Sequence, residues 1–337
     1  MAPNSGAIFL YPQEGFYNMK LLATIITALI ICASPTAIAE EKTSVDTVSQ
    51  FLQDVSVTVK TGGLGEGSGV IITREIQTKR GKEKINFIWT AAHVVDGLRS
   101  ERRIVKAGQT RRVIEFKDAQ IVKELVENGR RVGELKMDAK VIKYSDSENG
   151  EDLALLMVRK RDFISKGVEF YINKDKPVSI GTELYHVGSL LGQLGSNSQT
   201  RGIMSQVGRV LDLGTGDGVV FDQTSCPGFP GSSGGGIFLS EKAGPNSGKY
   251  VGMLVRGAGE TFNLIVPVRR MKKYAEKENI LWAIDETAKT PTLEEIISLP
   301  IEGGSAKTTE GTKKTEDSVK FPTLLNIKRG STNVKRQ

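Results

Sequence analysis

The stretch CPGFPGSSGGGIF, from Cys226 to Phe238, places two adjacent serines in a backbone that contains five glycines and two prolines. Segments so rich in glycine and proline are most often simple turns. The alternative is a nucleophile loop, in which a tight backbone directs N–H groups at one point beside a serine hydroxyl. A serine hydroxyl is a weak nucleophile until a base, most often histidine, accepts its proton. The second interpretation therefore requires a histidine and a carboxylate elsewhere in the chain.

The chain offers a candidate of each kind. His93 lies in WTAAHVVDG, directly after the apolar segment INFIWTAA, and Asp152 opens DLALLMV, where a carboxylate leads into an apolar strand pattern. A carboxylate beside a histidine holds the imidazole in the tautomer that accepts a proton, and it stabilises the imidazolium that forms. His93, Asp152 and one of the two serines are therefore candidate catalytic residues.

Short strand patterns occupy most of the chain, beginning with the alternation VSVTVK (Val55 to Lys60) and ending with FNLIVPV. Many short strands with regular turns indicate a β barrel or sandwich. The glycines of TGGLGEGSGVIIT lie between two strand patterns, which favours a hairpin over a phosphate-binding loop before a helix. The first amphipathic helical pattern is RRMKKYAEKENILWAI (269–284), which we expect to close the domain.

Three motifs in this order, TAAHVV, DLALL and PGSSGG, resemble the sequences around the catalytic residues of trypsin-like (chymotrypsin-fold) serine proteases, and they are closest to the bacterial HtrA/Deg type. GSGVII, LYHVGSLLGQLGSNSQTRGIMSQVGRV and the pair YVGMLV and FNLIVPV resemble further segments of that family. The resemblance covers roughly Val55 to Ile280. It implies an all-β fold of two six-stranded antiparallel barrels with a C-terminal helix, and an active site in the cleft between the barrels.

The resemblance also implies the role of each site residue. Ser233, which precedes a Gly-Gly pair, is selected as the nucleophile over Ser232. His93 is expected to shuttle the proton, and Asp152 to orient His93. The N–H groups of Gly231 and Ser233 are expected to form the oxyanion hole.

The substrate-binding wall is expected at Val255, Arg256 and Gly257, facing the loop at 226–230. This loop carries no acidic residue, and Gly257 leaves room, so we expect small or medium apolar side chains before the cut rather than Lys or Arg. The interval from His93 to Asp152 is long for the HtrA type. The extra length falls in KDAQIVKELVENGRRVGELKMDAK, which is expected to form an enlarged hairpin.

The N-terminal segment is expected to be removed rather than folded. LLATIITALIICA follows Lys20 and is shorter than the ~20 residues that span a bilayer. Pro35 and the small residues of AIA follow it, which indicates a signal peptide (residues 1–39) cleaved after Ala39 and an exported, periplasmic or secreted protein. Translation is expected to start at Met19, which would make residues 1–18 a misassigned extension. No stable membrane span is expected in the mature chain.

We expect a protease domain over residues 40–284, with barrels over about 40–160 and 170–268 and the closing helix over 269–284. From Asp285 the composition becomes polar, as in AKTTEGTKKTEDSVK, so residues 285–337 are predicted to form a disordered tail. The tail is too short, and lacks the strand patterns, for the peptide-binding PDZ domain that HtrA-type proteases commonly append.

These features predict an exported serine endopeptidase that cleaves protein or peptide substrates through an acyl-enzyme intermediate. No cofactor and no metal are expected, because two histidines and the single mature cysteine, Cys226, make a zinc site improbable. Cys226 is expected to be a packing residue, and His186 a satisfied or surface residue. The net charge of +7 is attributed to a solubilising surface rather than to a specific nucleic-acid partner. Two alternatives remain open: a catalytically silent peptide-binding module on the same fold, and a hydrolase of non-peptide esters.

Overall fold

The computed structural model describes residues 44–302, except residues 64, 107–108, 128–129, 174–175, 213–217 and 258–259. The predicted signal peptide with its cleavage site after Ala39, and residues 303–337 of the predicted tail, lie outside the described residues. Among the helices that are described, none is long and apolar enough to cross a membrane.

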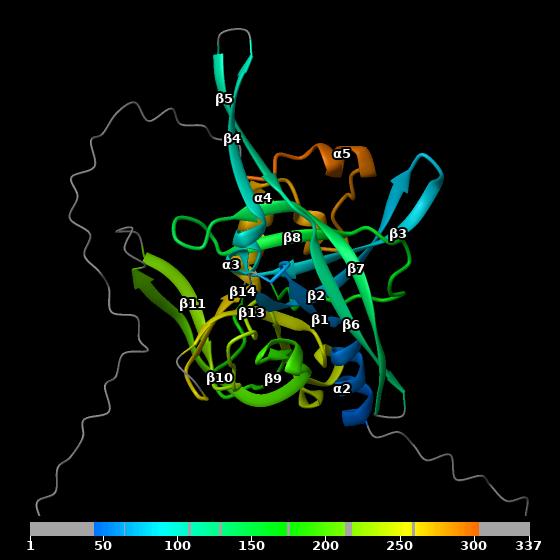
Figure 1. Ribbon diagram of the computed structural model, residues 1–337. Helices are drawn as coiled ribbons and strands as arrows, with labels where there is room; N and C mark the ends of the chain where they lie inside the picture. Colours follow the sequence, from blue (N-terminus) through cyan, green and yellow to red (C-terminus); the bar gives the residue numbers. More distant parts are fainter. Residues whose placement is uncertain are drawn as a thin grey trace, which may run out of the picture. The chain divides into compact units, whose positions relative to one another are not determined.

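Two closed barrels of six antiparallel strands form the core of the described domain (Figure 1). In order of pairing, the first barrel contains β1 (Ser56–Lys60), β2 (Glu66–Thr78), β3 (Gly81–Thr90), β8 (Leu153–Val158), β7 (Arg130–Ser145) and β6 (Ala119–Glu127). The second contains β10 (Gly195–Asp212), β11 (Gly218–Thr224), β14 (Asn263–Pro267), β13 (Tyr250–Gly257), β12 (Gly236–Leu239) and β9 (Glu183–Leu190). The prediction of an all-β fold with two six-stranded barrels is confirmed.

The predicted closing helix follows the second barrel and returns to the first. It comprises α4 (Val268–Lys277) and the short η4 (Leu281–Ala283). Trp89 of β3 donates its indole N–H to the Ala283 carbonyl at 3.1 Å, and Phe87 packs edge-on against Trp282 with ring centroids 4.9 Å apart. All of these aromatic side chains are buried, so the C-terminal segment seals the core of the first barrel and ties it to the second.

An N-terminal helix, α2 (Ser44–Asp54), precedes the first strand and was not predicted. Its apolar residues Val48, Phe51 and Leu52 recur at helical spacing, and Leu52 is fully buried. This periodicity is a signal that the sequence contains, but it covers only three turns. The alternating strand pattern that starts at Val55 obscured it.

Two hairpins account for the long interval between His93 and Asp152. The β6–β7 hairpin pairs Ala119 with Ala139 and extends to Glu127 and Arg130, which confirms the predicted enlarged hairpin. The remainder forms a separate two-stranded sheet of β4 (Arg99–Lys106) and β5 (Gln109–Phe116). Both insertions lie within the first barrel's sequence and leave the order of its strands unchanged.

Residues 285–302, predicted to belong to the disordered tail, are instead packed on the first barrel. They contain α5 (Leu293–Ser298), whose Ile296 is 1% exposed. The Tyr144 N–H of β7 donates to the Ile301 carbonyl at 2.8 Å. The predicted boundary at Asp285 was therefore wrong, because apolar residues of this segment recur sparsely among polar ones and their burial depends on a distant barrel wall.

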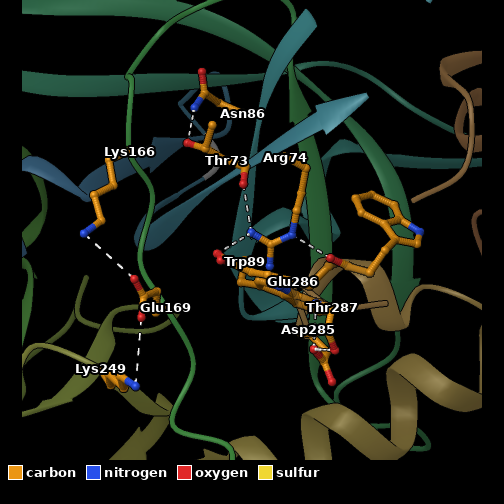
Figure 2. A network of polar contacts seen from close by, with 12 residues as sticks. Thr73, Arg74, Asn86, Trp89, Lys166, Glu169, Lys249, Asp285, Glu286 and Thr287 are labelled. Carbon is orange, nitrogen blue, oxygen red and sulfur yellow. Dashed lines mark hydrogen bonds and ion pairs between the residues drawn. The ribbon is translucent and has the colours of Figure 1, made fainter. Parts of the chain in front are cut away.

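A buried arginine links this segment to the first barrel. Arg74 of β2 is 5% exposed, and its guanidinium donates to the Trp282 carbonyl at 2.6 Å and to Glu286 at 3.1 Å. Figure 2 shows the Arg74 guanidinium between the Thr73 carbonyl and the Glu286 carboxylate. A buried cation is costly to leave without partners, so the segment after Ile284 contributes to the folded domain.

Candidate active site

The structure pairs His93 with Asp152. Asp152 precedes β8 and adopts a left-handed φ of 55°, which residues other than glycine seldom do. It is 2% exposed, and both its carboxylate oxygens lie 3.0 Å from Nδ1 of His93. Oδ1 also accepts the backbone N–H of His93 at 3.2 Å. A carboxylate on Nδ1 places the proton of a neutral imidazole there, which leaves Nε2 as the proton acceptor.

The loop with the two serines lies against the strand and turn that lead to His93. The Ser68 N–H of β2 donates to the Ser233 carbonyl at 2.7 Å. Gly234 has a φ of +86°, and a Cβ on it would lie 2.4 Å from Thr90 Oγ1 and 3.0 Å from Ala91 N. Only glycine permits this approach. The short helix α3 (Ala92–Val95), which carries His93, starts at the next residue, so the Ser233–Gly234 backbone of the second barrel lies against the turn of the first barrel that leads to His93.

The two adjacent serines have different environments. Ser232 is fully buried, and its hydroxyl accepts the N–H of Phe229 at 3.1 Å. Ser233 is partly exposed, and its hydroxyl makes no hydrogen bond with any residue that the structure describes. The hydroxyl of Ser232 is therefore committed to holding the loop, and the hydroxyl of Ser233 is available for chemistry.

The backbone N–H groups of the same loop show a similar division. Three already have acceptors: Ser232 donates to Phe229 and Gly235 to Ser232 within the loop, and Gly234 donates to Leu254 of β13. By contrast, the N–H groups of Gly231 and Ser233 have no acceptor among the described residues. Gly231 has a φ of +95°, and a Cβ there would lie 2.3 Å from the Ser189 carbonyl. Two unused donors beside a free hydroxyl form an arrangement that could bind an oxyanion.

The predicted substrate-binding residues end strand β13. Val255 is 3% exposed, whereas Arg256 and Gly257 are exposed. Arg256 donates to the Ser147 carbonyl at 3.1 Å, in the loop that leads to Asp152. This contact directs the Arg256 side chain toward the first barrel.

Asn263, the first residue of β14, lies between Gly257 of β13 and the loop at 226–230. The sequence analysis did not single it out. Its side chain is fully buried, and Nδ2 donates to the Cys226 carbonyl at 2.8 Å. A Cβ on Gly257 would lie 1.9 Å from Asn263 Oδ1, and a Cβ on Gly228 would lie 3.5 Å from the same atom. The sequence carries no signal for this placement, because Asn263 merely begins a strand pattern.

Cys226 and His186, the other two side chains considered in the sequence analysis, are both buried. Cys226 is fully buried, and burial raises the pKa of its thiol to about 11, as suits a packing residue. His186 is also fully buried, and burial lowers the pKa of its imidazole to about 4. Its Nδ1 bonds the Gly236 carbonyl at 3.0 Å, whereas its Nε2 has no hydrogen-bond partner in the described structure. His186 is therefore a neutral core residue behind the nucleophile loop, and it is only half satisfied.

Asp96 is a second carboxylate close to His93, and the sequence analysis did not single it out. The Tyr144 hydroxyl donates to its Oδ1. Burial raises the pKa of Asp96, and the Tyr144 hydrogen bond opposes that effect. In the residues that the structure covers, no group of three or more His, Cys, Asp or Glu side chains is arranged to hold a metal ion.

The sequence matches the trypsin-like peptidase domain family over residues 67–252. This match spans more than half of the chain, so the protein belongs to the trypsin-like peptidase family and is a serine-type endopeptidase. The resemblance inferred from the three motifs is thereby confirmed. No curated protein matches the chain.

Three solved structures resemble this chain at low sequence identity. An inactive mutant form of Rv3671c from M. tuberculosis H37Rv is 16% identical, with a TM-score of 0.47, and the match covers 72% of this chain and 92% of that one. Deg5 is 19% identical, with a TM-score of 0.46 and coverage of 73% and 98%. The HtrA-type protease AlgW with tripeptide is 18% identical, with a TM-score of 0.46 and coverage of 69% and 62%.

Proposed function

We propose that this peptidase is exported and cleaves protein or peptide substrates with a triad of Ser233, His93 and Asp152 through an acyl-enzyme intermediate. One observation carries the proposal. The buried Asp152 carboxylate contacts Nδ1 of His93 at 3.0 Å, and the glycine-rich loop of the other barrel packs against the turn that leads to His93. In that loop the Ser233 hydroxyl and two N–H groups have no partner among the described residues. A base held by a carboxylate, a hydroxyl and two N–H donors are the groups that acyl transfer requires, which supports the proposal.

The proposed reaction proceeds in two halves. Nε2 of His93 accepts the Ser233 proton as Oγ attacks the scissile carbonyl carbon. The developing oxyanion accepts hydrogen bonds from the N–H groups of Gly231 and Ser233. The imidazolium, stabilised by Asp152, then gives its proton to the leaving amine, and an acyl-enzyme remains. In the second half His93 takes a proton from a water molecule, whose oxygen attacks the acyl carbon; the bond to Oγ then breaks, His93 returns the proton to Ser233 and the acid product leaves.

The specificity proposal rests on the wall of Val255 to Gly257 and on Asn263 opposite the loop at 226–230. The Asn263 amide occupies space between these two walls and carries no charge. Asp222, an acid on the neighbouring strand β11, is 2% exposed and is held by both terminal nitrogens of Arg269. Small or medium apolar residues before the cut are therefore expected, and a peptide-library profile dominated by cleavage after Arg would contradict this expectation.

Labelling with a fluorophosphonate probe tests the nucleophile. The wild-type protein should be labelled on Ser233, and Ser233→Ala should abolish both labelling and peptide hydrolysis, with a loss of kcat of about 10⁶-fold. Ser232→Ala is the matched control, since it removes the neighbouring hydroxyl and should still be labelled. Mass-spectrometric assignment of the adduct to Ser232 would overturn the proposed triad.

The two alternatives give different results in the same experiment. A catalytically silent peptide-binding module would bind peptides and fail to react with the probe. A hydrolase of non-peptide esters would react with the probe and turn over an ester panel without cleaving a peptide library. The Ser233 hydroxyl has no hydrogen-bond partner among the described residues, and Asp152 holds His93 through Nδ1. Both observations favour the peptidase over the silent module.

Export is proposed from the N-terminal sequence and has its own test. The mature chain is expected to begin after Ala39 in the periplasm or the medium. N-terminal sequencing of the protein from cell fractions would show the cleavage site, and an intact N-terminus on protein recovered from the cytoplasm would argue against export.

A further inference from the structure

Four successive carbonyl groups of the nucleophile loop are each held by a hydrogen bond. The donors are the Leu191 N–H for Pro230 at 2.7 Å, the Ser68 hydroxyl for Gly231 at 2.7 Å, the Gly235 N–H for Ser232 at 2.9 Å and the Ser68 N–H for Ser233 at 2.7 Å. A trans peptide points its C=O and N–H in opposite directions. Holding the carbonyls of Pro230 and Ser232 therefore also directs the N–H groups of Gly231 and Ser233.

Ser68, on strand β2 of the first barrel, supplies two of these four contacts, those to the carbonyls of Gly231 and Ser233. These two carbonyls lie in the peptides on either side of the peptide that carries the Ser233 N–H. The Ser68 side chain is fully buried, and its Oγ accepts the Ser189 N–H of β9 at 2.7 Å. Because a hydroxyl has one proton, that proton is the one donated to the Gly231 carbonyl. Ser189 lies two residues before Leu191, which holds the Pro230 carbonyl. Ser68 thus reaches the loop directly and also through the end of β9.

Glu66 makes a second contact of this kind two residues earlier on β2. Its Oε2 accepts the N–H of Gln193 at 2.6 Å, in the short turn η2 (Gly192–Leu194) that follows Leu191. Lys60 lies 3.0 Å from its other oxygen. Partial burial opposes ionisation of Glu66, but the Gln193 N–H and Lys60 outweigh it, and the pKa of this carboxyl is lowered. Residues two apart on a strand share a face, so Ser68 and Glu66 both bond the segment from Ser189 to Gln193, which in turn holds the Pro230 carbonyl through Leu191.

We propose that Ser68 and Glu66 are positioning residues that hold the oxyanion hole of the second barrel from strand β2 of the first barrel. The inference rests on the proposed function, since it concerns the N–H groups of Gly231 and Ser233. Neither side chain reaches the reacting atoms, so each acts through the backbone that it holds. Catalysis then depends on a contact between the barrels that is separate from the meeting of Ser233 with His93.

The first test compares Ser68→Ala with Ser56→Ala. Ser56 of β1 is 3% exposed, and its hydroxyl donates to the Leu52 carbonyl at 2.7 Å, remote from the nucleophile loop. Both variants lose one buried hydroxyl that donates to a carbonyl, and Ser68→Ala also leaves the Ser189 N–H without its acceptor, so it should lose more stability in urea than Ser56→Ala. The second-order rate of fluorophosphonate labelling should fall about 10²-fold in Ser68→Ala, because the donors lose their geometry. It should stay near the wild-type value in Ser56→Ala.

The second test uses the surface partner of this pair, whose replacement does not threaten the core. The Glu66 side chain is 35% exposed. Glu66→Ala should lower the labelling rate about tenfold, the scale of a lost charged hydrogen bond. Glu66→Gln keeps an oxygen for the Gln193 N–H and should restore most of the rate, which a merely electrostatic role of Glu66 would not allow.

The outcomes separate this inference from the proposed function. Wild-type protein that is not labelled at Ser233 refutes the proposed function itself. Wild-type protein labelled at Ser233, with Ser68→Ala within threefold of Ser56→Ala, refutes the positioning role of Ser68 alone. Equal rates for Glu66→Ala and wild type refute the role of Glu66, and this second comparison remains decisive for the β2 contact even if Ser68→Ala does not fold.

Discussion

The two barrels build the candidate site by different physical means. The first barrel contributes side chains: a buried carboxylate, Asp152, pairs with His93, and the pair is oriented by charge and by burial. The second contributes backbone: the Gly231–Ser233 segment presents N–H groups next to four carbonyl contacts, two of which come from Ser68 of the other barrel. Changes in the first half should therefore alter protonation chemistry, and changes in the second half should alter loop geometry or stability.

Replacing Asp152 should break the side-chain half with the largest effect. Asp152→Asn preserves size but allows the amide to donate to Nδ1, which stabilises the wrong tautomer of His93. We expect kcat/KM to fall about 10⁴-fold with the fold retained, as measured with a peptide substrate and by circular dichroism. Glu148→Gln, which neutralises an exposed carboxylate in the same loop, is the control. A loss below tenfold for Asp152→Asn would remove the carboxylate from the mechanism.

Shortening the chain tests how far the first barrel extends. A chain ending at Asp285 loses the buried Ile296, the Glu286 partner of Arg74 and the Ile301 contact with β7. Burial of the isoleucine alone contributes about 2 kcal/mol, so Tm should fall by several degrees. A chain ending at Glu302 is the matched control and should keep the Tm of the full chain. Equal Tm values for both shortened chains would show that residues 286–302 add no stability.

Acid should weaken the second barrel through His186. The pKa of this imidazole is about 4 in the folded state, because burial disfavours its charge, against ~6.5 when unfolded. The unfolded chain therefore binds more protons between these values, and stability is full above pH ~6.5 and declines toward pH 4, by up to about 3 kcal/mol. Urea unfolding at pH 7 and pH 4.5 should show a smaller acid loss in His186→Gln than in wild type. Identical acid losses would mean that His186 does not titrate with unfolding.

Replacing Ser232 should give the smallest effect and sharpen the contrast between the adjacent serines. Ser232→Ala leaves the Phe229 N–H without its hydroxyl acceptor in a buried place. We expect about 1–3 kcal/mol of lost stability and activity within a few-fold of wild type. The midpoint of urea unfolding and the labelling rate measure these two effects. A variant that is fully stable but inactive would reverse the roles assigned to the two serines.

Local chemistry explains why the sequence indicated so much of this molecule. Alternating strands separated by turns identify the barrels, since each strand must bury one face. A histidine after an apolar strand, a carboxylate before one and a serine in a glycine-rich loop carry their chemistry within a few residues, so His93, Asp152 and Ser233 could be nominated, and the structure pairs His93 with Asp152. The helix α2 was missed because its short periodic pattern runs directly into the strand pattern at Val55, and the segment at 285–302 because its sparse apolar residues acquire a face only against the first barrel.

By itself, the sequence determined the strand patterns, the family motifs and the identity of the candidate reacting groups, because these depend on residue type and short spacing. Only the tertiary structure decided which N–H groups remain unused, that Asn263 lies between Gly257 and the loop at 226–230, and that Ser68 holds the Gly231 carbonyl. The Ser68–Gly231 contact joins residues 163 positions apart. This contact depends on how the two closed barrels meet. The sequence around Ser68 cannot predict whether its hydroxyl bonds a distant carbonyl or water.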